Sequence, residues 1–333
     1  MRPAHQDYLD AAAACGGRVG PLLDALAGVR GDDLAPFPGE GGTAERFAFL
    51  ARVAAADVTA ARVLEPHLDA LAILHEAGEE PAAVGTTWGV FAAEAPGAVL
   101  RATNDGDGWV LDGVKPWCSL GASLTDALVT ATTGDGERRM FRVSLRQPGV
   151  TAKESAWVAR GLAEVESGPL EFVSVPARPV GGPGWYLDRP GFRWGAVGVA
   201  ASWWGGCLPL VDAVLAKAKR QGANQLTASR AGRVHRMLAA ARAHLDTAAA
   251  VIDEQAPSTD EAAVLAHAVR GTVADAVDET LAGVRDVLGP SALAFDESLA
   301  RRYADLDLYV SQYHRGADDV SLVGHLPDGG VRW

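Results

Sequence analysis

The chain has 333 residues, of which 48% are hydrophobic and 22% are charged, an ordinary globular composition that excludes an intrinsically disordered protein. One domain usually takes roughly 100–200 residues, so the length predicts two or three domains. The net charge is 30 − 42 = −12. An acidic chain with scattered arginines matches a phosphate backbone poorly, so nucleic acid is disfavoured as a partner.

The first zone, residues 1–85, is rich in alanine and helical in period. Its clearest helix is predicted over residues 43–78, where apolar residues recur at spacings of three and four. Residues 31–42 hold two prolines and four glycines, which predicts a loop between two helical pieces. This zone predicts an N-terminal helical domain.

The second zone, residues 86–190, has the shorter pattern of β-strands. Asn104-Asp105-Gly106-Asp107-Gly108 predicts a hairpin turn, because Asn, Asp and Gly tolerate positive φ. The hairpin strands are expected at residues 98–103 and 109–111, and further strands at 126–132, 140–145 and 170–175. Short antiparallel strands without helices between them predict a central β-barrel or sandwich domain.

The third zone, residues 191–333, returns to long helical periods, with helices expected at residues 192–221, 228–254, 259–288 and 291–313. Four long amphipathic segments with short connections predict a four-helix bundle. Residues 194–211 carry no charge and reach the lower limit of membrane-span length, but they contain several glycines and a proline. We interpret them as a buried core helix and expect no membrane contact. The predicted fold class is therefore α+β.

The three cysteines, Cys15, Cys118 and Cys207, lie far apart, which favours a reducing compartment and argues against a disulfide or zinc framework. Asp7 and Asp10 precede any apolar run, so we expect no signal peptide and a cytoplasmic protein. The chain has no dinucleotide fingerprint, P-loop, nucleophile elbow or H-E-x-x-H sequence. No two histidines have the i, i+4 spacing that chelates a metal from one helix face, so we expect no metal site.

The most informative stretch is residues 109–132. A tight Asp112-Gly113 turn is expected to end one strand, and a second strand carries Lys115 and Trp117 before a loop of small residues. Such a loop can offer backbone N–H groups, the Ser119 hydroxyl and an indole wall to a flat heterocycle. Taken alone, a tryptophan beside a turn is more often part of a core.

This stretch resembles the acyl-CoA dehydrogenase family, whose β domain has an acidic residue and Gly, then Lys-x-Trp, then Ser or Thr two residues after the Trp. Upstream, residues 88–97 resemble the strand and Glu-Pro loop that open that domain, with Ala95 inserted. Downstream, residues 286–289 and Asp305 resemble the family's Gln-Val-x-Gly-Gly loop and Arg-Asp helix. The order of the three zones is also that of the family, so the resemblance covers nearly the whole chain.

The resemblance implies an FAD-binding flavoprotein that assembles as a homodimer or homotetramer. In the family, the strand before the Glu-Pro loop and the loop after Lys-x-Trp contact the flavin. The neighbouring subunit's bundle holds the adenine end through an arginine and the glycine-rich loop. Carried onto this sequence, the cofactor-binding residues are Phe91, Ala92, Ala93, Trp117, Ser119, Arg220, Val287, Leu288 and Gly289.

The chain departs from the family at both positions of the catalytic glutamate. The first position holds Tyr313, followed by His314 and Arg315, and the alternative position holds Phe192, followed by Arg193. A phenol with a pKa near 10 is a poor base at neutral pH, whereas histidine suits proton transfer there. The candidate catalytic residues are therefore Tyr313, His314 and Arg193, although His and Arg at a helix end also complement its dipole.

These features predict an FAD-dependent oxidoreductase that acts on an acyl thioester, a CoA thioester among them, or on a related small organic substrate. One alternative is a reduced-flavin monooxygenase on the same scaffold. Another is a catalytically silent subunit that forms a hetero-oligomer with an active homologue. With no carboxylate at either family position, we expect acyl-CoA substrates to reduce the flavin very slowly or not at all.

Overall fold

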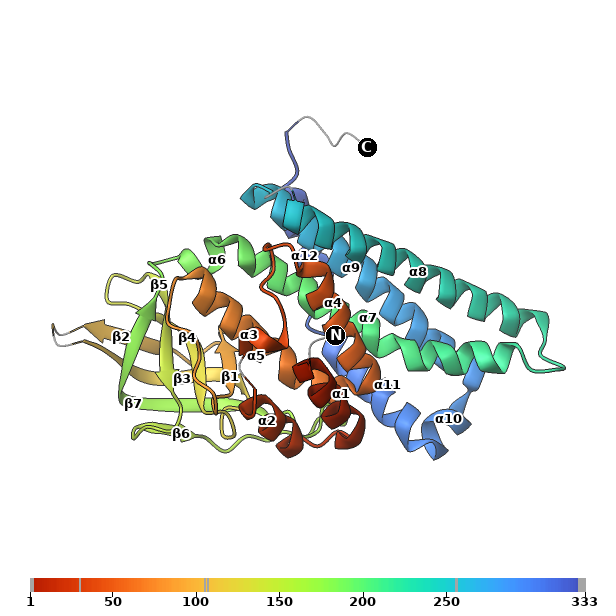
Figure 1. Ribbon diagram of the computed structural model, residues 1–333, viewed down its shortest axis with the longest axis horizontal. Coiled ribbons are helices and arrows are strands. Elements are labelled where there is room, and N and C mark those ends of the chain that lie inside the picture. The colour runs from red at the N-terminus through yellow and green to blue at the C-terminus, as the bar shows by residue number, and fades with distance from the viewer. Residues whose placement is uncertain (1–2, 30, 105, 107, 255–256, 329–333) are drawn as a thin grey trace.

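The computed structural model describes residues 3–29, 31–104, 106, 108–254 and 257–328 (Figure 1). The chain runs from helices through strands and back to helices, as the periodicity predicts. In Figure 1 the strands lie at one end of the molecule, and the long C-terminal helices extend away from them.

The described helices before the first strand are α1 (Pro3–Cys15), α2 (Gly20–Ala27), α3 (Gly31–Leu34), α4 (Thr43–Ala56) and α5 (Val58–Glu76). The single helix expected over residues 43–78 is wrong, because the chain breaks at Asp57. Its carboxylate accepts a hydrogen bond from the Ala60 N–H (3.2 Å) and caps the start of α5. The loop expected over residues 31–42 begins with the short helix α3.

The strands form one sheet that closes on itself. They are β1 (Trp88–Phe91), β2 (Leu100–Asn104), β3 (Trp109–Ser119), β4 (Asp126–Thr132), β5 (Arg138–Ser144), β6 (Val150–Ala152) and β7 (Ser167–Val180). The pairings β4–β2, β2–β3, β3–β7, β7–β5 and β5–β4 complete a ring, to which β1 adds on β4 and β6 on β7. The β domain is therefore a barrel. Its expected hairpin joins β2 to β3, and Asp105 and Asp107 of the turn lie outside the described residues.

The turn expected at Asp112-Gly113 is wrong, because β3 continues through both residues and pairs with β2 and β7. The register against β7 shifts between Leu111 and Gly113, which is the mark of a β-bulge. Gly113 has φ +121°, and a Cβ there would lie 2.2 Å from the Val99 carbonyl oxygen. The bulge, rather than a turn, therefore requires glycine at this position.

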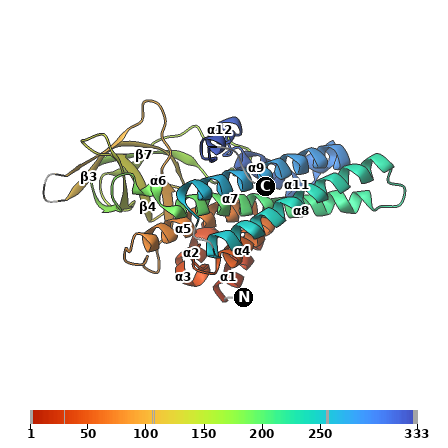
Figure 2. The same ribbon diagram turned by 90° about the horizontal axis from the view of Figure 1, so that it is seen from above.

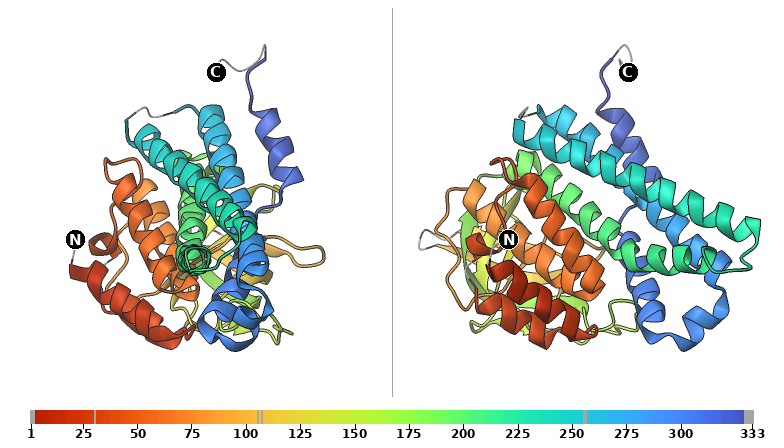
Figure 3. Two further views of the ribbon diagram at one scale, coloured as in Figure 1. Left: turned by 90° about the vertical axis from the view of Figure 1, so that its right-hand side faces the viewer. Right: turned by 45° about the vertical axis from the view of Figure 1, so that its right-hand side comes forward.

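The C-terminal helices are α6 (Trp185–Asp188), α7 (Pro190–Ala218), α8 (Gln225–Glu254), α9 (Thr259–Gly283), the π-helical turn η1 (Val284–Leu288), α10 (Pro290–Phe295), α11 (Glu297–Val310) and α12 (Gly316–Gly324). The last predicted helix is divided at Asp296, whose carboxylate accepts from the Leu299 N–H and starts α11. Figures 2 and 3 show α7, α8 and α9 side by side, with the N-terminal helices and α12 on opposite sides of them.

Helix α7 forms the centre of the helical part and contacts α4, α8 and α9. Among the described helices it alone is long and apolar enough to cross a membrane, and 61% of its most apolar window is buried inside the protein. A Cβ on Gly205 would lie 2.1 Å from the Ala51 carbonyl oxygen, so this glycine allows α4 and α7 to touch. The expected core helix is thus found in the centre of the packing.

Helix α11 ties the three zones together. The Arg302 guanidinium donates to the carbonyl oxygens of Ala54, Ala55 and Ala56 (2.8–2.9 Å) and caps the end of α4. The Arg301 Nη1 pairs with Asp57 (2.7 Å) at the start of α5. Asp305, 2% exposed, accepts the Leu162 N–H of the β domain (2.6 Å). Through these contacts α11 links the end of α4 and the start of α5 to the β domain.

Candidate functional site

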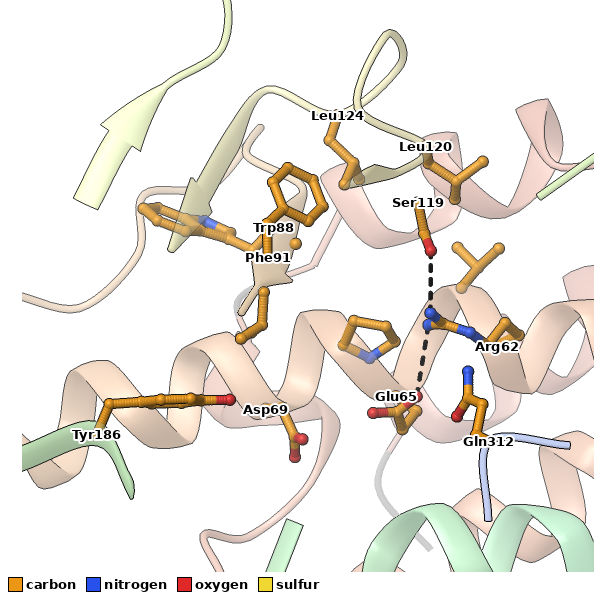
Figure 4. Close-up of a pocket in the computed structure, with 14 residues that line it drawn as sticks. Arg62, Glu65, Asp69, Trp88, Phe91, Ser119, Leu120, Leu124, Tyr186 and Gln312 are labelled. Carbon is orange, nitrogen blue, oxygen red and sulfur yellow. Dashed lines mark hydrogen bonds and ion pairs between the residues drawn. The ribbon is translucent and has the colours of Figure 1, made fainter. Parts of the chain in front are cut away.

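A cavity of about 170 Å³ lies where α5, β1, the loop after β3, α6 and the segment after α11 meet. Figure 4 shows the side chains that point into it. Apolar walls come from β1 and the loop after β3, and the polar residues are Arg62, Glu65, Asp69, Ser119, Tyr186 and Gln312.

The charged side chains of the cavity share one face of α5, because residues three and four positions apart on a helix are neighbours. Arg62, Glu65 and Asp69 have this spacing in an otherwise largely apolar, buried helix. The helix is held to the barrel by His67, whose Nδ1 accepts the Trp88 N–H (3.2 Å). Burial lowers the pKa of His67 to about 4, so it stays neutral and keeps this acceptor at physiological pH.

The Arg62 guanidinium connects α5 to the loop after β3. Its Nη2 donates to the Ser119 Oγ (3.0 Å), and its Nη1 lies 3.5 Å from the Glu65 Oε2. Ser119 also shares a hydrogen bond with the Ser167 hydroxyl (2.7 Å). The Tyr309 hydroxyl donates to the same Glu65 oxygen (3.1 Å). A continuous polar network therefore runs from α11 through α5 to the barrel.

Burial strongly perturbs the two carboxyl groups of the cavity. It raises the pKa of Glu65 to about 7, while Arg62 opposes the rise and Asp69 adds to it. Burial also raises the pKa of Asp69, against the influence of Arg46 and Arg189. Glu65 is thus divided between its acid and base forms near neutral pH, the condition in which a carboxyl can both accept and return a proton.

The loop around Ser119 has a strained backbone. Trp117 and Leu120 have φ values of +57° and +58°, which non-glycine residues rarely adopt and which concentrate at functional sites. The register against β7 shifts between Lys115 and Cys118, so the Trp117 side chain turns outward and is 58% exposed. Ser119 therefore lines the cavity, whereas the Trp117 indole, two residues earlier, is exposed.

The end of β1 borders this loop. Phe91 lines the cavity and is buried, and the carbonyl of Ala92 accepts from Arg138 Nη2 (3.3 Å). Ala93, the next residue, is exposed. The Thr130 hydroxyl donates to the same Ala92 carbonyl (3.4 Å) and accepts from the buried Lys115 Nζ (2.8 Å). Burial lowers the pKa of Lys115 to about 8. The predicted flavin-contact residues of the β domain therefore lie near one another.

The residues predicted for catalysis do not line the cavity. The Tyr313 hydroxyl donates to Asp319 (3.1 Å), and burial together with nearby carboxylates raises its pKa to about 12. Gln312, one residue earlier, reaches the cavity instead. His314 is exposed, and its backbone N–H donates to Asp318.

The alternative family position lies behind the cavity wall. The Phe192 ring packs edge-on against Tyr186 at 5.3 Å, and Tyr186 forms the wall. Arg193 stacks over Phe192 (5.3 Å) instead of reaching the cavity. Neither family position therefore brings a carboxylate to this site.

The predicted adenine-binding residues lie elsewhere in the chain. Arg220 is exposed in the connection between α7 and α8, at the end of the bundle farthest from the barrel (Figure 1). Val287 is buried in η1, Leu288 is half-buried, and Gly289 follows with φ +75°. The single chain does not bring these residues to the cavity, which is the arrangement expected if they serve a neighbouring copy.

Sequence reasoning missed the cavity residues of α5 and α6. Arg62, Glu65 and Asp69 lie within the helix predicted over residues 43–78 and were not singled out, although charges at spacings of three and four within a buried helix are a recognisable signal. Tyr186 and Gln312 carried no such signal, since only the fold brings α6 and the segment after α11 to α5.

Comparison with known proteins identifies the fold. Residues 182–321 match the family described as acyl-CoA dehydrogenase, C-terminal domain. No curated protein matches the chain.

Three solved structures illustrate the likeness. KijD3 in complex with dTDP has a TM-score of 0.78 at 19% identity, over 97% of this chain and 96% of that one. FMN-bound TdsC from Paenibacillus sp. A11-2 has a TM-score of 0.79 at 15% identity, over 96% of both chains. The nitrososynthase from Micromonospora carbonacea var. africana has a TM-score of 0.77 at 18% identity, over 98% of both.

The resemblance found in the sequence is confirmed: the chain has the acyl-CoA dehydrogenase-like fold over nearly its whole length, and its helical bundle matches that family's C-terminal domain.

Proposed function

We propose that the protein is a flavoenzyme that uses reduced flavin and O2 to oxygenate a small polar substrate. The observation that carries the proposal is the cavity beside Ser119, which is small and lined by Arg62, Glu65 and Asp69. An acyl chain requires an apolar slot, whereas this lining favours a compact substrate with polar groups. TdsC, one of the similar structures, is described as a dibenzothiophene monooxygenase, which supports oxygenation on this scaffold.

The residues around the cavity fit a flavin. Trp117 offers an exposed indole to a flat ring, and Ser119, two residues later, offers a hydroxyl at the cavity wall. The buried Arg138 Nε has no hydrogen-bond partner within the described part of the chain, so it has a donor left for a ligand next to Ala92. A bound flavin would supply the two-electron redox chemistry and the reaction with O2, which no protein side chain provides. The chain's own residues would hold the ring and shape the substrate's surroundings.

Two groups of residues bear on whether the flavin is FAD or FMN. The exposed Arg220 favours FAD, since a neighbouring copy could use it to hold the pyrophosphate. Pro290 replaces the second glycine of the adenine loop, and Asp286 is paired with Arg230 (2.9 Å), which favours FMN. TdsC and KijD3 are both described with FMN. We retain FAD, held across a homodimer or homotetramer, as the expectation and FMN as its competitor.

The first experiment measures flavin binding. FAD and FMN are titrated separately into purified protein while flavin fluorescence is recorded. We expect roughly stoichiometric binding of at least one of them and a weaker affinity in Trp117→Ala. Trp157→Ala is the control, because the Trp157 indole donates to the Ala163 carbonyl and does not line the cavity. If neither flavin binds at tens of micromolar, the enzymatic proposal loses its support and the silent-subunit alternative gains it.

The second experiment separates oxygenation from dehydrogenation. The protein is supplied with flavin, NADH and a flavin reductase under ¹⁸O2, together with small amines, phenols and sulfides. Mass spectrometry is expected to find one ¹⁸O atom in a product. A parallel anaerobic stopped-flow run with straight-chain acyl-CoA thioesters is expected to leave the flavin absorbance unchanged.

A second candidate, dehydrogenation of an acyl thioester, is favoured by one observation. Glu65 brings a carboxyl with a pKa of about 7 to the cavity, and such a group can take an α-proton. Rapid anaerobic bleaching of the flavin by an acyl-CoA, lost in Glu65→Gln, would establish this candidate in place of oxygenation.

A further inference from the structure

Glu65 and Asp69 form a pair of acidic side chains at the cavity. They lie four residues apart on α5, so they share one face of the helix, and Figure 4 shows both carboxyl groups beside the same space. Glu65 is 8% exposed. Both of its contacts, the Tyr309 hydroxyl and the Arg62 Nη1, go to Oε2. No hydrogen bond to Oε1 is found within the described part of the chain.

The charges that face this pair come from several elements. Those that interact with Glu65 are Arg46 of α4, Arg62 and Asp69 of α5, Tyr186 of α6, Arg270 of α9 and Tyr309 of α11. Asp69 is also influenced by Arg189, which precedes α7, and its Oδ1 lies 3.6 Å from the Arg46 Nη2. Of the arginines, only Arg62 lines the cavity. Its guanidinium already contacts Ser119 and Glu65 and lies 5.9 Å from the Tyr309 ring centre. The cavity wall therefore holds two carboxyl groups, each with an arginine partner, and one cation, Arg62, which is itself engaged.

We propose that Glu65 and Asp69 bind a protonated amine of the substrate and that Glu65 accepts its proton, so that the substrate of this site is a small amine. The proposal rests on the function proposed above and names its substrate class and its acid/base residue. An anionic substrate is disfavoured, because it would enter beside two carboxyl groups with no uncommitted cation among the lining residues.

The step is a proton transfer that balances without an oxidant. The ammonium R–NH3⁺ and the Glu65 carboxylate become R–NH2 and the Glu65 carboxylic acid, and no electrons are gained or lost. The N–H bond pair stays on nitrogen as a lone pair, which an oxygenation at nitrogen consumes. Burial raises the pKa of Glu65 from 4.5 to about 7, which makes the carboxyl about 300-fold better as a proton acceptor than an ordinary one. Exclusion of water also favours the neutral pair over the charged pair.

The test measures binding of small ligands that differ in charge. Propylamine and benzylamine are the cationic probes, with 1-propanol and benzyl alcohol as neutral controls and propionate and benzoate as anionic ones. Isothermal titration calorimetry of the purified protein at pH 6.5 and pH 8 gives affinity, and two buffers with different ionisation enthalpies give the protons released. We expect an amine to bind at least tenfold more tightly than its alcohol, and the acids not to bind measurably.

The proton count identifies Glu65. With a pKa of about 7, roughly 0.8 of the Glu65 population is protonated at pH 6.5, so binding an ammonium there releases up to about 0.8 proton to the buffer. Glu65→Gln, whose amide oxygen can still accept from Tyr309, is expected to weaken amine binding tenfold or more and to lose most of this release. Asp69→Asn is expected to weaken binding and to keep only part of the release, because the Asp69 charge helps to raise the pKa of Glu65. Glu297→Gln, an exposed position on α11, is the control and changes neither quantity.

Three results would overturn the proposal: amines that bind no better than alcohols, tight binding of the acids, or undiminished proton release in Glu65→Gln. Circular dichroism establishes whether each variant is folded. If Glu65→Gln does not fold, the weaker amine binding expected of Asp69→Asn still tests the charge argument. Because these measurements use neither flavin nor O2, their failure leaves the oxygenase proposal standing. Conversely, a protein that binds amines but no flavin would support the amine site and contradict the oxygenase proposal.

Discussion

Replacement of Glu65 by Gln gives the most direct test of the electrostatics of the cavity. A carboxyl whose folded-state pKa is raised destabilises the protein above its unfolded-state pKa, because the folded state holds the proton more tightly. The effect is absent at low pH, grows between pH 4.5 and pH 7, and is complete above pH 7. Taking 4.5 for the unfolded chain and about 7 for the folded one, the penalty is about 0.8 kcal/mol at pH 5 and about 3.3 kcal/mol at pH 8.

The measurable quantity is the difference between these two values, about 2.5 kcal/mol. The free energy of unfolding of the unmodified protein should fall by this amount, relative to that of Glu65→Gln, between pH 5 and pH 8. Glu65 is nearly buried, so solvent screening reduces the figure little. Acidic groups that do not interact with Glu65, such as Asp305 with a pKa of about 6, remain in both proteins and cancel in the comparison, whereas Asp69 interacts with Glu65 and its contribution is part of the measured difference.

The assay is urea unfolding of flavin-free protein, followed by circular dichroism and tryptophan fluorescence. Coincident transitions by the two probes establish that one free energy describes the process. Glu297→Gln is expected to track the unmodified protein at both pH values. A difference between Glu65→Gln and the unmodified protein that changes by less than about 1 kcal/mol from pH 5 to pH 8, or that changes in the opposite direction, would refute the assigned ionisation.

Tyr313→Phe should leave flavin reactions unchanged and lower the free energy of unfolding by about 1 kcal/mol, since its hydroxyl bonds Asp319 away from the cavity; a large loss of oxygenation would return Tyr313 to the site. Gly205→Ala should lower the free energy of unfolding by about 3 kcal/mol, because its Cβ would meet the Ala51 carbonyl, and an unchanged urea midpoint would contradict that packing. Ser119→Ala should weaken flavin binding about tenfold through the lost hydroxyl. If the variant and the unmodified protein bind flavin equally well, the flavin does not contact Ser119. Light scattering should find a dimer or tetramer, and a monomer that binds FAD tightly would exclude a site shared between copies.

The sequence predicted the larger features of the fold because they depend on local patterns. The strand at residues 126–132 was placed correctly to the residue, since its apolar run ends abruptly on both sides. The breaks at Asp57 and Asp296 were missed, because an N-cap inside a continuous helical period does not interrupt the apolar spacing. The turn at Asp112-Gly113 was misplaced for a related reason. A glycine with positive φ serves a bulge as readily as a turn, and only the closeness of Val99 distinguishes them.

The site was less predictable than the fold. Family positions led to Ser119, which lines the cavity, and to Trp117, which is exposed two residues before it. The same reasoning led to Tyr313 and Phe192, whose side chains are turned into packing with Asp319 and Tyr186. Counting along a sequence locates a backbone position, whereas the direction of a side chain depends on neighbours that are distant in the chain.

The position of Glu65 gives the missing glutamates a physical interpretation. A buried carboxyl is stable only where partners offset its desolvation, and here Arg62 and Tyr309 do so from α5 and α11. A carboxylate at residue 313 would lie beside Asp319, whose like charge would raise its pKa, although Arg270 also faces this position. One at residue 192 would lie against the Tyr186 ring, outside the cavity. On α5 the Arg62 charge opposes the like charge of Asp69. Arg301 and Asp57 fix the start of that helix, and His67 fixes its middle to β1. We therefore propose proton transfer from α5 rather than from either family position, and we expect that Tyr313→Glu does not by itself create a fast acyl-CoA dehydrogenase.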